Sequence, residues 1–167
     1  MALSAFMNFS GARGESKQQG YEGWVEIQGW DWDISAETSW IKGGGASVGK
    51  PNPGAMNFEH YYDSASPAIM AFICSGKSFD TVKLHMCKTT GGQKLEAFFM
   101  MTLTDAFITK VACSADDTGN VVQKVELVFK QVEIDYKEQK GTPGKPGALG
   151  PPINYKWNIP AGTSSGG

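Results

Sequence analysis

Apolar and polar residues alternate with a period of two along most of the chain, which is the pattern of half-buried β-strands. The pattern predicts strands over residues 3–10, 24–34, 56–60, 81–88, 93–104, 107–114, 121–136 and 153–159. The Gly91-Gly92 pair is a hairpin signal between two of these strands. Since several of the strands are joined by short turns, the chain is predicted to form an antiparallel meander, arranged as two sheets or as a closed barrel.

One segment carries the signals of a helix. Ser66 is suited to the N-cap, Pro67 to the first helical position, and Gly76 lies just past the expected end. These residues predict a helix over residues 67–75. A helix with so few turns is not stable alone, so we expect it to pack on the sheet.

Three segments lack any regular periodicity. Residues 35–55 form a long glycine-rich connection, which is uncommon in a compact domain and usually has a purpose. Residues 141–152 are rich in proline and glycine, and residues 160–167 are expected to be a flexible tail. The whole chain, residues 1–167, is expected to form a single domain that buries roughly 70% of its unfolded surface.

Composition and charge narrow the possible functions. The formal net charge is -2 and the pI is about 5.7, so the protein has no long-range field to attract nucleic acid or an anionic membrane. The N-terminus has no basic leader followed by an apolar block, and no run is apolar enough to span a bilayer. We therefore expect no signal peptide, no membrane insertion and no nucleic-acid partner, in a protein that starts in the cytoplasm.

The cysteine and histidine residues are candidate metal ligands. Cys74, Cys87 and Cys113 are too few and too irregularly spaced for a disulfide framework, so reduced thiols are expected. His85 and Cys87 could join a distant cysteine on zinc, but the chain lacks the paired spacings of such sites. Packing explains these residues adequately, and we predict no metal and no cofactor.

The segment Gly44 to Lys50 resembles a phosphate-binding loop in its two glycines and its lysine. The hydroxyl that such a loop needs next is replaced by Pro51, which cannot begin a helix that offers its N–H groups to phosphate. Elsewhere there is no nucleophile motif, and His60 and His85 have no recognisable catalytic partners. We therefore predict no catalytic residues and no enzyme activity.

The chain has more apolar strand positions than a single small core can hold. The residues in excess are Trp24, Trp30, Trp32, Phe98, Met100, Val121, Val125, Leu127, Val128, Phe129, Val132 and Ile134. Such an excess commonly marks a surface that another subunit covers. A monomeric β-barrel that binds a small apolar ligand would use the same side chains, so this alternative stays open.

Several segments together carry a family resemblance. They are GESK at residues 14–17, the W-x-W at 30–32, the glycine tract that ends at Gly49-Lys50, HYYDSASPAIM at 60–70, CSGK at 74–77, VELVFKQVEIDYKEQK at 125–140 and YKWNI at 155–159. In order and spacing, from about residue 6 to residue 159, the chain resembles the haemolysin-coregulated protein (Hcp) family of bacterial type VI secretion systems. The proline-rich connection at 141–152 and the glycine-rich tail depart from common members.

The resemblance implies a mainly β fold, an antiparallel two-sheet β-barrel with one short α-helix on its side and a long extended loop. It also implies homohexameric rings that stack into the inner tube of a contractile apparatus and carry small effector proteins in the lumen. The implied partners are further copies of the chain, the spike protein at the tube tip and the contractile sheath. The protein would then leave the cytoplasm for the extracellular space or a target cell.

The family's extended loop, which touches neighbouring subunits, matches roughly residues 35–55. The implied interface residues are Ser39, Trp40, Ile41, Lys42, Gly43, Gly44, Gly45, Val48, Gly49 and Lys50. The alternative is a mobile loop that lies over the monomer's own surface.

The lumen wall is predicted from alternation alone. If Trp30 and Trp32 pack inward or against a neighbour, Asp31 and Asp33 point the other way and are candidates for the polar wall. The pattern leaves open that they are simply solvated surface charges.

Overall fold

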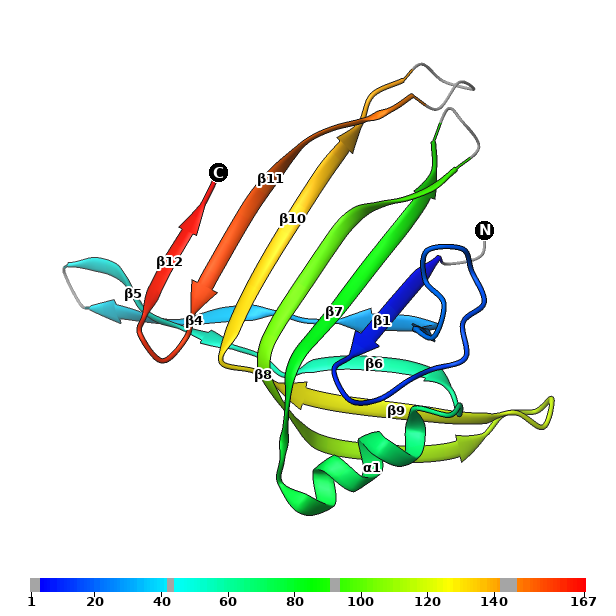
Figure 1. Ribbon diagram of the computed structural model, residues 1–167. Coiled ribbons are helices and arrows are strands. Elements are labelled where there is room, and N and C mark those ends of the chain that lie inside the picture. The colour runs from blue at the N-terminus through cyan, green and yellow to red at the C-terminus, as the bar shows by residue number, and fades with distance from the viewer. Residues whose placement is uncertain (1–3, 42–43, 91–93, 142–146) are drawn as a thin grey trace.

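The computed structural model describes residues 4–41, 44–90, 94–141 and 147–167, and these are mostly antiparallel β-strands with a short helix (Figure 1). In chain order the elements are β1 (Ala5–Phe9), β2 (Val25–Glu26), β3 (Gly29–Asp31), β4 (Ile34–Ile41), β5 (Gly45–Pro53), β6 (Met56–Tyr61), α1 (Ser66–Ser75), β7 (Ser78–Thr89), β8 (Leu95–Ala115), β9 (Val121–Val128), β10 (Gln131–Gln139), β11 (Leu149–Asn158) and β12 (Thr163–Gly166).

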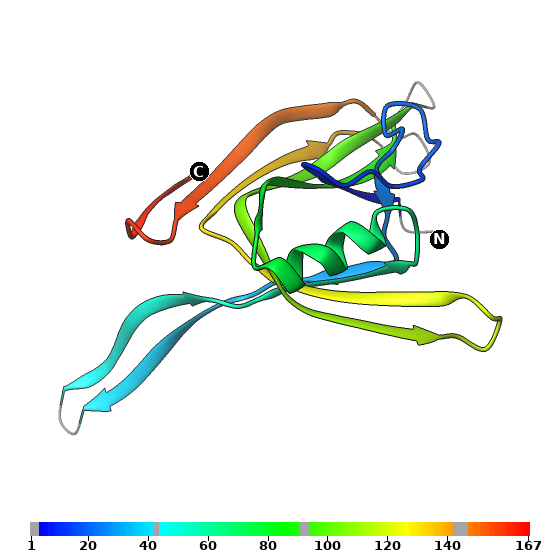
Figure 2. The ribbon, with the colours of Figure 1, turned by 60° about the horizontal axis from the view of Figure 1, so that its bottom comes forward.

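Strand β8 joins two layers of one sheet. The main path runs β12-β11-β10-β8-β7-β1-β2, and a branch leaves β8 through β9 and β6 to β3. The first part of β8 pairs with β7 and β10, whereas the part from Phe107 onward pairs with β9. Between these parts, Asp105 has a positive φ of 53°. The predicted mainly β, antiparallel fold with a helix at its side is confirmed; its two layers are continuous through β8, and β12 and β2 end the described path (Figures 1 and 2).

The core lies between the two layers and α1. Phe79 is fully buried, and its ring lies 3.9 Å from that of Phe72 on α1 and 5.1 Å from that of Phe9 on β1. Ile69 on the helix is also fully buried. The helix is thus held by its apolar face, as its short length requires.

The predicted helix is confirmed with a small change at its start. The helix begins at Ser66, one residue early, and the N-cap is Ala65 without a side-chain bond. The hydroxyl of Ser66 instead accepts the N–H of Asp63 at 3.0 Å. At the other end Gly76 has φ 68°, the left-handed conformation that glycine adopts most easily.

Several predicted strand boundaries were wrong. Residues 95–104 and 107–114 belong to the single strand β8, and residues 24–34 contain the separate strands β2 and β3 and the first residue of β4. Residues 121–136 are divided into β9 and β10 at Phe129 and Lys130. At this break the chain passes from one layer to the other. A period-two pattern that is interpreted as one continuous strand does not show such a change of layer.

The same break corrects the count of excess apolar residues. Val125, Leu127, Phe129 and Val132 are buried in the core, because inward positions are odd-numbered on β9 and even-numbered on β10. Of the remaining residues in the predicted excess, Val121 and Val128 are exposed and the rest are half-buried. The apolar excess is therefore smaller than the sequence indicated.

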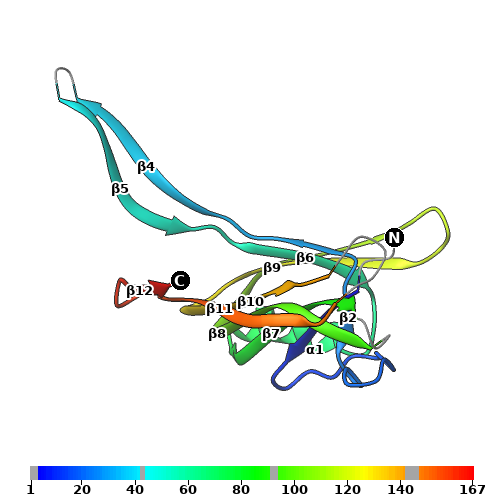
Figure 3. The same ribbon diagram turned by 90° about the horizontal axis from the view of Figure 1, so that it is seen from above.

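The predicted irregular connection at 35–55 is a two-stranded β-hairpin, β4–β5, paired from Ile34↔Pro53 to Ile41↔Gly45. The hairpin projects far from the two layers (Figures 2 and 3). Its alternation is invisible in the sequence because both of its faces meet solvent, so no position needs to be apolar.

The chain's last segments also differ from the expectation. Strand β11 begins at Leu149, inside the predicted connection, and includes Pro151 and Pro152. Residues Thr163–Gly166 of the tail pair with β11 as β12. The tail's flexibility and the single-domain organisation remain predictions.

Candidate functional site

The hairpin β4–β5 brings together most of the residues implied at a subunit interface. Their described side chains are exposed, among them Ser39 and Lys50, and Val48 is 72% exposed. The hydroxyls of Ser39 and Ser47 are hydrogen-bonded across the two strands. Trp40 and Ile41 lie in β4 near the tip, whereas Lys42 and Gly43 lie outside the described residues.

The tryptophans beside the predicted lumen residues pack toward the core. The Trp30 ring lies 5.5 Å from that of Phe99, and its Nε1 donates to the sulfur of Met86 at 3.2 Å. Trp32 Nε1 donates to the carbonyl of Gly54 at 3.0 Å, and its ring lies 5.5 Å from that of Phe129. Trp30 and Trp32 therefore pack inward, which is the arrangement in which Asp31 and Asp33 are expected to point away from the core.

Asp31 and Asp33 are both exposed, but the structure places them at different sites. Asp31 lies on β3 and accepts a hydrogen bond from Asn57 Nδ2 at 3.1 Å. Asp33 lies at the base of the hairpin, where its carbonyl accepts the N–H of Gly54 at 2.9 Å. Its carboxylate occupies the space that a side chain at Gly54 would need. Only Asp31 lies on the charged face described next.

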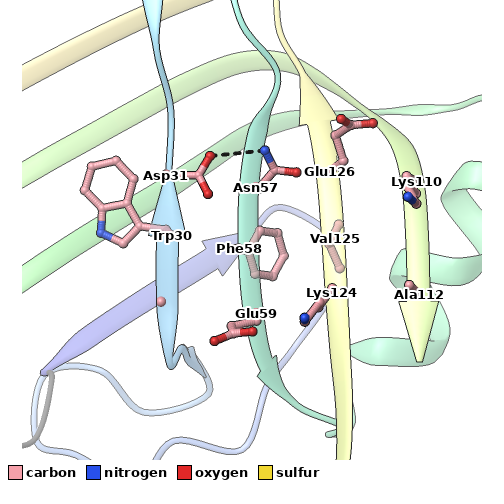
Figure 4. Close-up of a pocket in the computed structure, with 11 residues that line it drawn as sticks. Trp30, Asp31, Asn57, Phe58, Glu59, Lys110, Ala112, Lys124, Val125 and Glu126 are labelled. Carbon is pink, nitrogen blue, oxygen red and sulfur yellow. Dashed lines mark hydrogen bonds between the residues drawn. The ribbon is translucent and has the colours of Figure 1, made fainter. Parts of the chain in front are cut away.

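The charged face is the outer side of β3, β6, β9 and the second part of β8 (Figure 4). A hollow of about 400 Å³ lies over it. Its charged and amide residues are Asp31, Asn57, Glu59, Lys110, Lys124 and Glu126. Phe58 and Val125, from the same strands, are buried on the inner side. The alternation of each strand therefore separates a polar outer face from the core.

Strand register arranges these side chains in two rows. One row runs Asp31, Asn57, Glu126, Lys110, and the other runs Gly29, Glu59, Lys124, Ala112. The ion pairs found within 4.0 Å among the described residues involve none of these charges. Glu126 accepts a hydrogen bond from the Thr109 hydroxyl at 3.0 Å. Lys110 and Lys124 thus have no acidic partner within 4.0 Å among the described residues.

Sequence reasoning found Asp31 but missed the other charged residues of this face. Their only sequence signal is the polar half of a period-two pattern. That signal does not show which strands, far apart in the chain, lie side by side.

His85 and Cys87, the candidate metal ligands of the sequence, belong to a hydrogen-bonded cluster with Tyr21. The Tyr21 hydroxyl lies 3.0 Å from His85 Nδ1 and accepts from the Cys87 thiol at 3.2 Å. Burial raises the pKa values of Tyr21 and Cys87, and burial followed by the charge of Lys83 lowers the pKa of His85 to about 4. All three groups are therefore neutral near pH 7, and Tyr21 holds the 11–24 loop against β7. The described residues hold no cluster of acidic, His or Cys side chains placed to bind a metal.

The depressed pKa of His85 predicts a loss of stability in acid. Below about pH 6.5 the unfolded chain takes up a proton that the folded chain rejects until about pH 4. Discounted for the solvent that reaches this half-buried ring, the free energy of unfolding should fall by about 1–2 kcal/mol over that range. In His85→Gln, which lacks the titrating ring, the free energy of unfolding should fall by about 1–2 kcal/mol less than in the wild type over the same pH range. Urea unfolding at several pH values measures this difference. Equal pH dependence in the two proteins would contradict this assignment.

No helix among the described residues has the length and apolar composition needed to cross a bilayer.

Comparisons with known proteins agree with the fold. The family model described as "Type VI secretion system effector, Hcp" matches residues 6–136. Protein Hcp1 of Pseudomonas aeruginosa is 31% identical over 160 residues, which cover 95% of this chain and 96% of that protein.

Two solved structures superpose over almost the whole chain. Hcp1 from Salmonella typhimurium does so with a TM-score of 0.79 and 26% identity, covering 99% of this chain and all of that one. A solved type six secretion system protein has a TM-score of 0.84 at 22% identity, with 98% of this chain and 100% of that chain covered, which supports the fold alone. From the family match and the Pseudomonas relative together, this chain belongs to the Hcp family of type VI secretion proteins.

Proposed function

We propose that this protein is a structural subunit of the type VI secretion tube. Copies of the chain form homohexameric rings, the rings stack into the expelled inner tube, and small effector proteins travel in the lumen. Family membership supports this function. The observation that carries it is the β4–β5 hairpin, which forms a separate two-stranded sheet outside the two layers.

A lone hairpin of this kind needs a partner. An isolated two-stranded sheet is marginally stable in water, and the described side chains of β4 and β5 meet solvent rather than the rest of the chain. Exposed Ile34 and Val48 add apolar surface that a partner would cover. A second copy is the simplest partner, because head-to-tail contacts between identical chains form a ring when the rotation between copies closes.

The charged face is suited to a lumen wall. Its hollow carries the charged side chains of both signs described above, with Asp31 among them, and a charged wall of this kind suits a water-filled lumen. We assign Asp31 to this wall and place Asp33 beside it, at the root of the hairpin.

The remaining partners follow from the family. We infer contacts with the spike protein at the tube tip and with the contractile sheath. The subunit would reside in the cytoplasm before the machine contracts and in the extracellular space or target cell afterwards.

The state of assembly of the purified protein tests the proposal. Native mass measurement is expected to give a particle of six 18.0 kDa chains, and electron microscopy is expected to show rings and stacks. A protein that stays monomeric at high concentration would overturn the proposal and favour the ligand-binding barrel.

A further inference from the structure

The charged face has opposite charges at its two edges. Asp31 lies on β3 at one edge and Lys110 lies on β8 at the other, in the same row of the sheet (Figure 4). Between them lie Asn57 on β6 and Glu126 on β9. Asp31 has an amide as its hydrogen-bonding partner, and Lys110 forms no ion pair within 4.0 Å among the described residues.

Both edges are open for pairing. Among the described strands, β3 pairs with β6 alone. The β7 and β10 ladders on β8 end at Phe107 and Thr104, so Lys110–Ala115 pair with β9 alone. Unpaired N–H and C=O groups on strand edges are ready to pair with another chain.

Strand directions permit a head-to-tail repeat. β3, β6, β9 and β8 are antiparallel in succession, so the layer has an even number of alternating strands. The β8 edge of one copy therefore runs antiparallel to the β3 edge of a copy placed beside it in the same orientation. Such a contact joins different surfaces of two identical chains, which is the kind of contact that closes into a ring.

We propose that Asp31 of one copy pairs with Lys110 of the next copy at each junction of the ring. This inference rests on the proposed ring and specifies which charges meet across its subunit boundary. The second copy supplies a cation for Asp31, which has none within 4.0 Å among the described residues of its own chain. Opposite charges on adjacent strands stabilise pairing. Like charges at the same place oppose it.

Charge reversal tests the pairing. Asp31→Lys alone places two lysines at each junction, and Lys110→Asp alone places two aspartates there. Each should raise the subunit concentration at which half of the chains are in rings by about tenfold, and the double variant should restore the wild-type value. Asp80→Lys, the same charge change at an exposed position of β7, is the matched control and should leave the value unchanged. Singles without effect, or a double variant worse than either single, would overturn the pairing.

A disulfide provides a direct test that does not depend on the size of the charge effect. Within one chain, two strands separate β3 from β8, so positions 31 and 110 are roughly 14 Å apart, too far for a disulfide. The variant with both Asp31→Cys and Lys110→Cys should therefore form, on oxidation, covalent ladders that end at six chains. The variants that carry only Asp31→Cys or only Lys110→Cys control for cross-links through the exposed Cys74 and Cys113, and they should give no such ladder.

The two experiments separate this inference from the proposed function. If the double-cysteine protein forms six-chain particles that do not cross-link, the Asp31–Lys110 junction is wrong and the ring proposal stands. If the wild-type protein stays monomeric, both are overturned.

Discussion

Replacing residues 38–48 by an Asn-Gly turn is expected to give a folded protein that no longer assembles into rings. Residues 38–41 and 45–48 of this range form the outer part of β4–β5, whose described side chains are exposed and do not contribute to the core. The free energy of unfolding should therefore change by less than about 1 kcal/mol. The loss of the interface that we propose for the hairpin should raise the concentration needed for assembly by at least about 100-fold. Urea unfolding and light scattering measure the two effects.

The matched control keeps the hairpin and its hydrogen-bonded hydroxyls. Ser39→Thr with Ser47→Thr retains the pair that links the two strands, and threonine is favoured in strands. This variant should assemble as the wild type does. If the shortened chain assembles equally well, the hairpin has no part in the ring.

The second large effect is expected in the core, where Phe79→Ala should lower the free energy of unfolding by about 3–5 kcal/mol. Phe79 is fully buried and its ring contacts those of Phe72 and Phe9, so truncation opens a cavity between the helix and the sheet. Because α1 is held by its apolar face, the helix should lose protection against hydrogen exchange first. Urea denaturation and amide exchange measure both changes.

Phe98→Ala is the matched control, since it removes the same side chain from a half-buried position. The Phe98 ring lies beneath the Lys88 ammonium at 4.1 Å. Losing this contact should cost about 1 kcal/mol or less. Equal losses in the two variants would show that the contacts around Phe79 do not anchor the helix.

Some elements could be predicted because their signals are local. The helix was found from Ser66, Pro67 and Gly76, which act on the backbone within a few residues. Strands β6 and β7 were found because apolar residues on one face alternate with polar residues on the other. The mainly β, antiparallel fold follows from these local patterns and from the family resemblance.

Other elements could not be predicted because their signals depend on distant residues. The division of residues 121–136 at Phe129 and Lys130 is set by the change of layer, where the Lys130 N–H is bonded to the Thr104 carbonyl. The hairpin β4–β5 has exposed faces, so its pairing leaves no apolar pattern in the sequence. Alternation shows which residues share a face only after the strand boundaries are known.

By itself, the sequence determined the alternating strands, the helix and the family, and it placed Asp31 and Trp30 on opposite faces of a strand without deciding which face is inward. The tertiary structure alone decided that β8 serves two layers, that residues 35–55 project as a hairpin, and that Asp31 and Lys110 lie at opposite edges of one row. The reason is physical. Local backbone preferences depend on neighbouring residues, whereas the register between strands depends on hydrogen bonds and packing between residues far apart in the chain, and a shift of one residue reverses every face.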